Sequence, residues 1–111
     1  TEREMAKAWF LLVLAGLFEI GLPIGFTLTE QAAFRILGWA VAVVCMGLSG
    51  CLLWLAQKLI PIGTAYAAWT GIGGAGTFLI GVLVFGDTLT VWRALGAAMI
   101  IGGVITLKLA H

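Results

Sequence analysis

The stretch AWFLLVLAGLFEIGLPIGFTLT, residues 8–29, is apolar over most of its length and carries one ionisable side chain, Glu19. A helix of this length is long enough to cross a hydrocarbon core about 30 Å thick. With a rise of about 1.5 Å per residue, Glu19 lies about 17 Å along the helix from its nearest charged neighbours, Lys7 and Glu30. We therefore predict a carboxylate near the midplane of a membrane.

The composition supports this prediction, because 62% of the residues are hydrophobic and only 10% are charged. A soluble domain carries about a quarter charged residues. Three similar apolar stretches follow the first, so a cleaved signal peptide does not explain it. These features indicate an integral membrane protein.

The breaks in the apolar pattern predict an all-α fold with one domain over residues 1–111. Its four transmembrane helices are expected over about residues 8–28, 34–56, 62–85 and 91–110. The connections TEQAA, QKLIP and GDTLT are too short to form a soluble domain. The activity is therefore expected within the bilayer.

The loop charges give little preference for either orientation. One side carries four basic residues and the other carries two, namely Arg3, Lys7, Lys58 and Lys108 against Arg35 and Arg93. So weak a bias permits insertion in both orientations and hence an antiparallel dimer. A fixed topology with both termini in the cytoplasm is the open alternative.

Several classes of function lack the residues they need. The net charge of +1 and the absence of a basic cluster argue against nucleic-acid binding. His111 is the only histidine, so no metal site or cofactor is predicted, and no role is assigned to Cys45 or Cys51. No nucleophile and base stand together, so an enzyme is not expected.

A carboxylate in hydrocarbon is costly unless it is protonated or paired, so Glu19 is predicted to bind a proton or a cation. The alternative is a neutral Glu19 that is hydrogen-bonded between helices. Gly16 and Leu22 lie about one turn away on either side, and Gly16 leaves room for a helix or a ligand. Pro23 has no N–H for the carbonyl of Glu19, so it either frees a second acceptor there or only bends the helix.

The third predicted span contains PIGTAYAAWTGIGGAG, in which Tyr66, Trp69 and Thr70 can share one helix face. Their polar groups need partners at membrane depth, and the aromatic rings also suit a flat or quaternary cation. An aromatic pair that only packs in the core is the alternative. Gly71 and Gly73 follow, and they predict a hinge, a packing seam or both.

Gly96 and Gly103 in the fourth span are seven residues apart and face the same way. Four helices leave little room for a translocation path, so we expect this glycine face to contact a second subunit.

AGLFE in the first span, Ser49 in the second and PIGTAYAAWTGIG in the third precede a basic residue that opens a glycine-bearing fourth span. Together they resemble the small multidrug resistance family over residues 8–110. The motif WTGIG resembles the guanidinium-exporter subtype, whereas the quaternary-ammonium subtype more typically has WSGVG.

The resemblance implies a proton-coupled antiporter of the inner (plasma) membrane, multi-pass and built as an antiparallel dimer, in which each subunit contributes Glu19. Protons and a small cation would compete for the two carboxylates, since like charges in a low-dielectric site favour protonation. By the same resemblance Tyr66 would gate or bond Glu19. Trp69 and Ser49 would join its hydrogen-bond network, with Gly16 and Leu22 at the pocket. The region from Gly71 to Gly73 would bend during exchange.

Three residues depart from the subtype pattern. Leu22 replaces a usual Trp, Pro23 a usual Ala, and Thr27 a frequent Lys. A smaller Leu22 and a kinked helix would open the pocket to substituted guanidinium compounds.

Three other functions remain open from the sequence. The chain could export quaternary ammonium and other lipophilic cations, which need only charge and aromatic faces. It could be one subunit of a heterodimer, although a homodimer is favoured. It could also be a non-transporting subunit whose Glu19 pairs with a basic residue of a larger complex.

Overall fold

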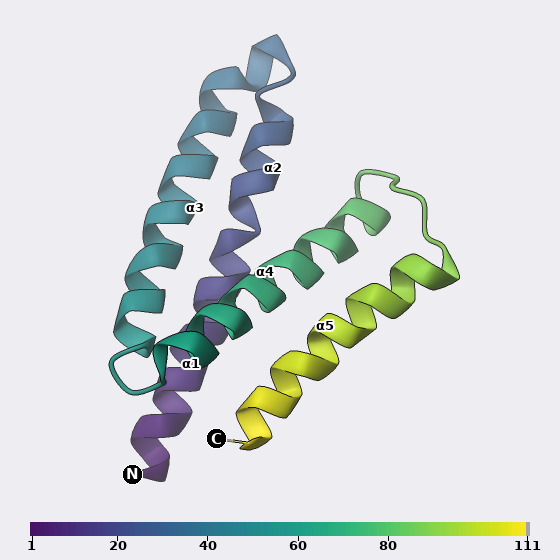
Figure 1. Ribbon diagram of the computed structural model, residues 1–111. Helices are drawn as coiled ribbons and strands as arrows, with labels where there is room; N and C mark the ends of the chain where they lie inside the picture. The colour runs from purple at the N-terminus through teal and green to yellow at the C-terminus, as the bar shows by residue number, and fades with distance from the viewer. Residues whose placement is uncertain (111) are drawn as a thin grey trace.

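The computed structural model describes residues 1–110 and is helical, in agreement with the predicted all-α class. The helices are α1 (Glu2–Glu19), α2 (Gly21–Leu28), the 3-10 turn η1 (Ala32–Phe34), α3 (Arg35–Ala56), α4 (Ile62–Leu83) and α5 (Val91–Ala110). Four segments are long and apolar enough to cross a membrane by length and composition: 2–28, 32–56, 62–83 and 91–110. These four segments confirm the expected number of spans. Both ends of the chain lie at the same end of the molecule (Figure 1).

The first span is divided in two at Ile20, between α1 and α2. Pro23 cannot donate to the carbonyl of Glu19, so the regular hydrogen-bond pattern cannot continue through this turn. The Ile20 N–H bonds instead to the carbonyl of Leu17, at 3.2 Å. The interruption lies at the level where the sequence predicts a kink, directly beside Glu19.

The helices pack through small residues. α3 lies along α1 and α2, while α4 crosses α1 and also contacts α5 (Figure 1). The core contains Trp9, Leu12, Ile60 and Trp69 together with five alanines, each at most 1% exposed: Ala8, Ala15, Ala56, Ala65 and Ala68. Alanine lets helix backbones approach closely, which is how helices associate in a lipid environment.

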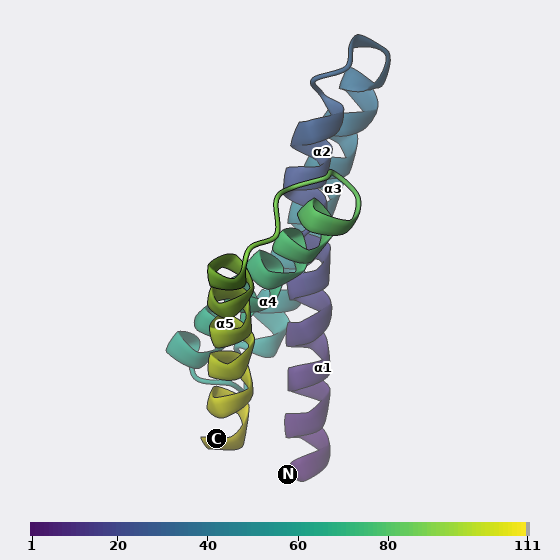
Figure 2. The ribbon, with the colours of Figure 1, turned by 90° about the vertical axis from the view of Figure 1, so that its right-hand side faces the viewer.

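Helix α5 lies at the edge of the molecule, and none of its residues is buried (Figure 2). Large apolar side chains cover much of the remaining surface, among them Ile36 and Trp92, which are 87% and 80% exposed. Such a surface suits lipid or a second protein subunit rather than water.

The closest approach of α2 and α3 depends on two facing glycines. A Cβ built on Gly25 would lie 2.5 Å from the carbonyl oxygen of Gly38, and a Cβ on Gly38 would lie equally close to that of Gly25. Real Cβ atoms do not come so near, so either substitution would force the two helices apart. This crossing positions α2, which begins beside Glu19.

We expect the Gly25→Ala substitution to destabilise the folded protein by about 1–3 kcal/mol, the usual cost of overpacking a tight contact. Gly47→Ala on α3 is the matched control, since nothing lies within 4 Å of a Cβ there. Thermal unfolding in detergent micelles, followed by circular dichroism, measures both variants. Equal melting temperatures for the two would contradict the close crossing.

Candidate functional site

Glu19 is the last residue of α1, and its carboxylate lies against Gly73 of α4. A side chain at Gly73 would overlap Oε2 of Glu19, so α4 reaches this position because residue 73 has no Cβ. Oε2 is buried and has no hydrogen-bond partner among the described residues. The site therefore presents a buried acceptor without a donor, which a proton or a cation with N–H groups would satisfy.

Ser49 and Trp69 join three helices near Glu19. The buried Ser49 hydroxyl donates to the Ala15 carbonyl at 2.6 Å, and the Trp69 indole Nε1–H donates to Ser49 Oγ at 2.8 Å. Ala15 lies one turn before Glu19 on α1. The resemblance implied that these side chains join the network of Glu19 itself, but in this chain their bonds end on the backbone that positions it. Both donor hydrogens are already used, so neither reaches the carboxylate.

Tyr66 lies near the start of α4, before Gly73, and is 58% exposed. Its ring packs on that of Trp69, with centroids 5.3 Å apart, and its carbonyl accepts from the Thr70 hydroxyl at 2.8 Å. Seven residues separate Tyr66 from Gly73, which is about 10 Å along the helix. Among the described residues its hydroxyl makes no bond to Glu19, so a gating role for Tyr66 remains a prediction.

The structure uses two of the predicted glycines as helix contacts. A Cβ on Gly16 would meet the side chain of Ile72, and one on Gly71 would meet Val104 of α5. Helix α4 runs without interruption through Gly71 and Gly73. A pocket role for Gly16 and a hinge in α4 therefore remain predictions, whereas the packing seam is observed.

Leu22 does not point toward Gly73 with Glu19. It lines an apolar groove of about 380 Å³ between α2 and α3. The groove also contains an edge-to-face pair, Phe26 and Trp39, with ring centroids 5.7 Å apart. Its remaining lining residues are Ala42, Val43, Met46 and Gly47. Leu22 lies one turn after Glu19 along the chain, and the groove suits a hydrophobic group.

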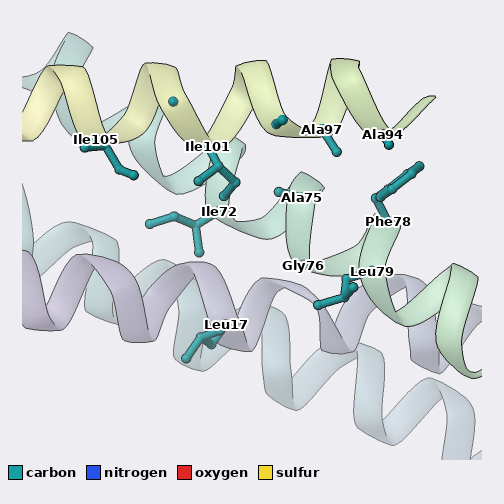
Figure 3. A pocket seen from close by; sticks show the side chains of 12 residues that line it. Leu17, Ile72, Ala75, Gly76, Phe78, Leu79, Ala94, Ala97, Ile101 and Ile105 are labelled. Atoms are coloured by element: carbon teal, nitrogen blue, oxygen red, sulfur yellow. The ribbon is translucent and has the colours of Figure 1, made fainter. Parts of the chain in front are cut away.

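A wider cavity of about 670 Å³ lies between α4 and α5 (Figure 3). Ile72, Phe78 and Ile101 line it, together with Leu17 of α1 (Figure 3). None of its lining residues is charged or carries a hydroxyl group. It therefore suits an apolar chain or a helix rather than a cation.

Sequence reasoning named Thr27 only as a departure from the subtype pattern and did not group it with the polar residues beside it. Thr27, Thr77 and Asp87 line a cavity of about 270 Å³ between α2, α4 and the loop after α4. Thr77 lies one turn after Gly73, so helical spacing from Gly73 could have indicated it. Thr27 and Asp87 come from other segments, and only the packing of those segments brings them there.

The site can be compared with known proteins. The family model described as Small Multidrug Resistance protein matches residues 7–100. Guanidinium exporters of Proteus vulgaris and of Yersinia pseudotuberculosis serotype I are 42% and 41% identical over 103 residues, which cover 93% of this chain and 98% of each relative. The guanidinium exporter of Escherichia coli K12 is 38% identical over 103 residues, 93% of this chain and 97% of the relative.

The family match agrees with the four apolar helices and with the predicted multi-pass protein of the inner membrane. It also confirms the resemblance drawn from AGLFE, Ser49 and PIGTAYAAWTGIG. The chain belongs to the small multidrug resistance family.

Proposed function

We propose that this protein exports guanidinium or substituted guanidinium cations across the inner membrane in exchange for protons, and that Glu19 binds both. The buried Oε2 of Glu19, which has no donor among the described residues, carries the proposal. Relatives named guanidinium exporters, similar over 93% of this chain, support the substrate class.

The chemistry of Glu19 explains how exchange can be coupled. A carboxylate accepts two parallel N–H bonds from a planar guanidinium, and the same oxygens accept a proton. The two ligands therefore exclude each other at one site. Net export follows if the proton enters from one side of the membrane and the cation leaves by the same side.

An antiparallel dimer completes this arrangement. Helix α5 has no buried residue, and Gly96 and Gly103 have nothing within 4 Å of a Cβ position. A second copy packed on this glycine face would cover the helix and enclose two Glu19 residues. Tyr66, which is exposed in one chain, would then be available to a carboxylate of the other subunit. We favour a homodimer.

Alternating access needs an element that moves relative to Glu19. The interruption at Ile20 separates α2 from α1, and α4 touches the carboxylate through Gly73. Bending of α4 at Gly71 to Gly73 would open one side of the site while closing the other.

The groove beside Leu22 favours substrates that carry an apolar substituent. The guanidinium group would bind Glu19 while the substituent enters the groove lined by Phe26 and Met46. The same groove is the observation that favours a second candidate function, export of quaternary ammonium or other lipophilic cations.

We expect Glu19→Gln to reduce guanidinium-driven proton flux by at least about a hundredfold, the scale at which a side chain that transfers protons contributes. Purified protein in liposomes, with an internal pH dye, gives the measurement. Glu30→Gln is the matched control, because Glu30 is an exposed carboxylate in the turn after α2. Proton-coupled transport that survives in the Glu19→Gln protein would disprove the proposal.

We expect Leu22→Trp to fill part of the groove and to lower transport of butylguanidinium relative to guanidinium by roughly tenfold, the discrimination that an apolar pocket achieves. Leu55→Trp, on the exposed surface of α3 outside the groove, is the control. Substrate-evoked currents on supported membranes give the ratio for each variant. An unchanged ratio would mean that the substituent lies elsewhere.

A further inference from the structure

A small cavity, lined in part by polar side chains, lies between α2, α4 and the loop after α4. That loop is at the end of the molecule opposite the termini (Figure 1). The cavity has a volume of about 270 Å³, and we call it the Asp87 pocket. Its walls come from α2, from α4 and from the loop between α4 and α5. They consist of Pro23, Ile24, Thr27, Thr77, Ile80, Gly81, Phe85 and Asp87.

The side chains of this pocket offer acceptors only. Thr27 donates its hydroxyl hydrogen to the Pro23 carbonyl at 3.0 Å, and Thr77 donates its own to the Gly73 carbonyl at 2.7 Å. A hydroxyl has one hydrogen, so only oxygen lone pairs remain for a ligand. The Asp87 carboxylate adds two more acceptor oxygens and a negative charge. These groups favour a ligand that donates hydrogen bonds, and the charge of the exposed Asp87 favours a cation.

The backbone holds Asp87 at the pocket. Its N–H donates to the Gly81 carbonyl at 2.9 Å, and a Cβ at Gly81 would overlap its carboxylate. No ion pair to Asp87 is present in residues 1–110. The basic residues at this end contact backbone carbonyls instead: Arg93 that of Thr88 at 2.6 Å, and Arg35 that of Thr29 at 3.4 Å.

The pocket begins one helical turn from the transport site. The Thr77 hydroxyl bonds to the carbonyl of Gly73, and Gly73 is the residue against which the Glu19 carboxylate lies. The rise from Gly73 to Thr77 is about 6 Å. Pro23, which also lines the pocket, lies one turn after Glu19 along the chain. The Asp87 carboxylate itself lies against Gly81, eight residues after Gly73, which is about 12 Å along α4 from the contact of Glu19.

The geometry points to a second cation site in the Asp87 pocket, where a guanidinium ion binds on its way between the membrane surface and Glu19. This inference rests on the proposed function. Guanidinium has several N–H donors for Thr27, Thr77 and Asp87, and the Phe85 ring at the pocket offers a face for a flat cation. Threonine at position 27 matters here, because a lysine would supply a cation of its own.

The first experiment separates this site from Glu19. Equilibrium dialysis of radiolabelled guanidinium against the Glu19→Gln protein in detergent should detect one weak site per chain. Adding Asp87→Asn should weaken this binding by at least about threefold, the scale of a partly exposed charge interaction. Adding Thr27→Lys should do the same by occupying the pocket. Glu30→Gln, which removes an exposed carboxylate at the same end, should leave binding unchanged.

The second experiment measures the effect on transport. In liposomes, Asp87→Asn alone should raise the apparent KM for guanidinium about threefold, with the maximal rate nearly unchanged. The site would be overturned if the Glu19→Gln protein bound no guanidinium, or if adding Asp87→Asn and adding Glu30→Gln weakened binding equally. An unchanged KM in the Asp87→Asn protein would also overturn it. Each of these results would leave the proposed function intact. If the wild-type protein transports no guanidinium but Asp87 still governs binding, the proposed function fails and the pocket remains a cation site.

Discussion

The structure depends on one constraint, which is the placement of Glu19, with its Oε2 atom buried, in a bundle of apolar helices. A charge in such a medium is costly unless a proton or a cation accompanies it. The surrounding residues do not remove this cost, because Oε2 has no partner in the described part of the chain. They bring the backbone close instead, with Gly73 against the carboxylate and Pro23 interrupting the helix that follows. The site is built to leave the carboxylate available to a ligand.

The sequence predicted the features that follow from the chemistry of a single segment. The four spans could be predicted because an apolar backbone in lipid must satisfy its own hydrogen bonds, which leaves helices as the form of each run. Glu19 could be predicted because it is the only charge in the first run, and the interruption because Pro23 removes a particular hydrogen bond.

Features that join two segments were beyond the sequence. Nothing in the spacing indicates that Ser49 bonds to Ala15, or that Ile72 packs on Gly16. Thr27, Thr77 and Asp87 line one cavity because α2, α4 and the loop after α4 pack around it. How α2 and α3 pack depends on contacts such as that of Gly25 with Gly38, where a single methyl group would increase the distance between the two helices. Such contacts follow from three-dimensional packing rather than from periodicity along one helix.

The short helix α2 separates two properties that a transporter must combine. Leu22 and Phe26 face the apolar groove along α3, while Pro23 and Thr27 face the polar pocket along α4. The first span is interrupted at Ile20, so Glu19 belongs to α1 whereas the three departures from the subtype pattern, Leu22, Pro23 and Thr27, all lie on α2. Ser49 donates to the Ala15 carbonyl of α1 before this break, and Trp69 donates to Ser49, so these bonds position the end of α1 without contacting α2. Under the proposed mechanism, α1 would hold the proton-binding residue while the adjoining helix α2 would determine which cation reaches it.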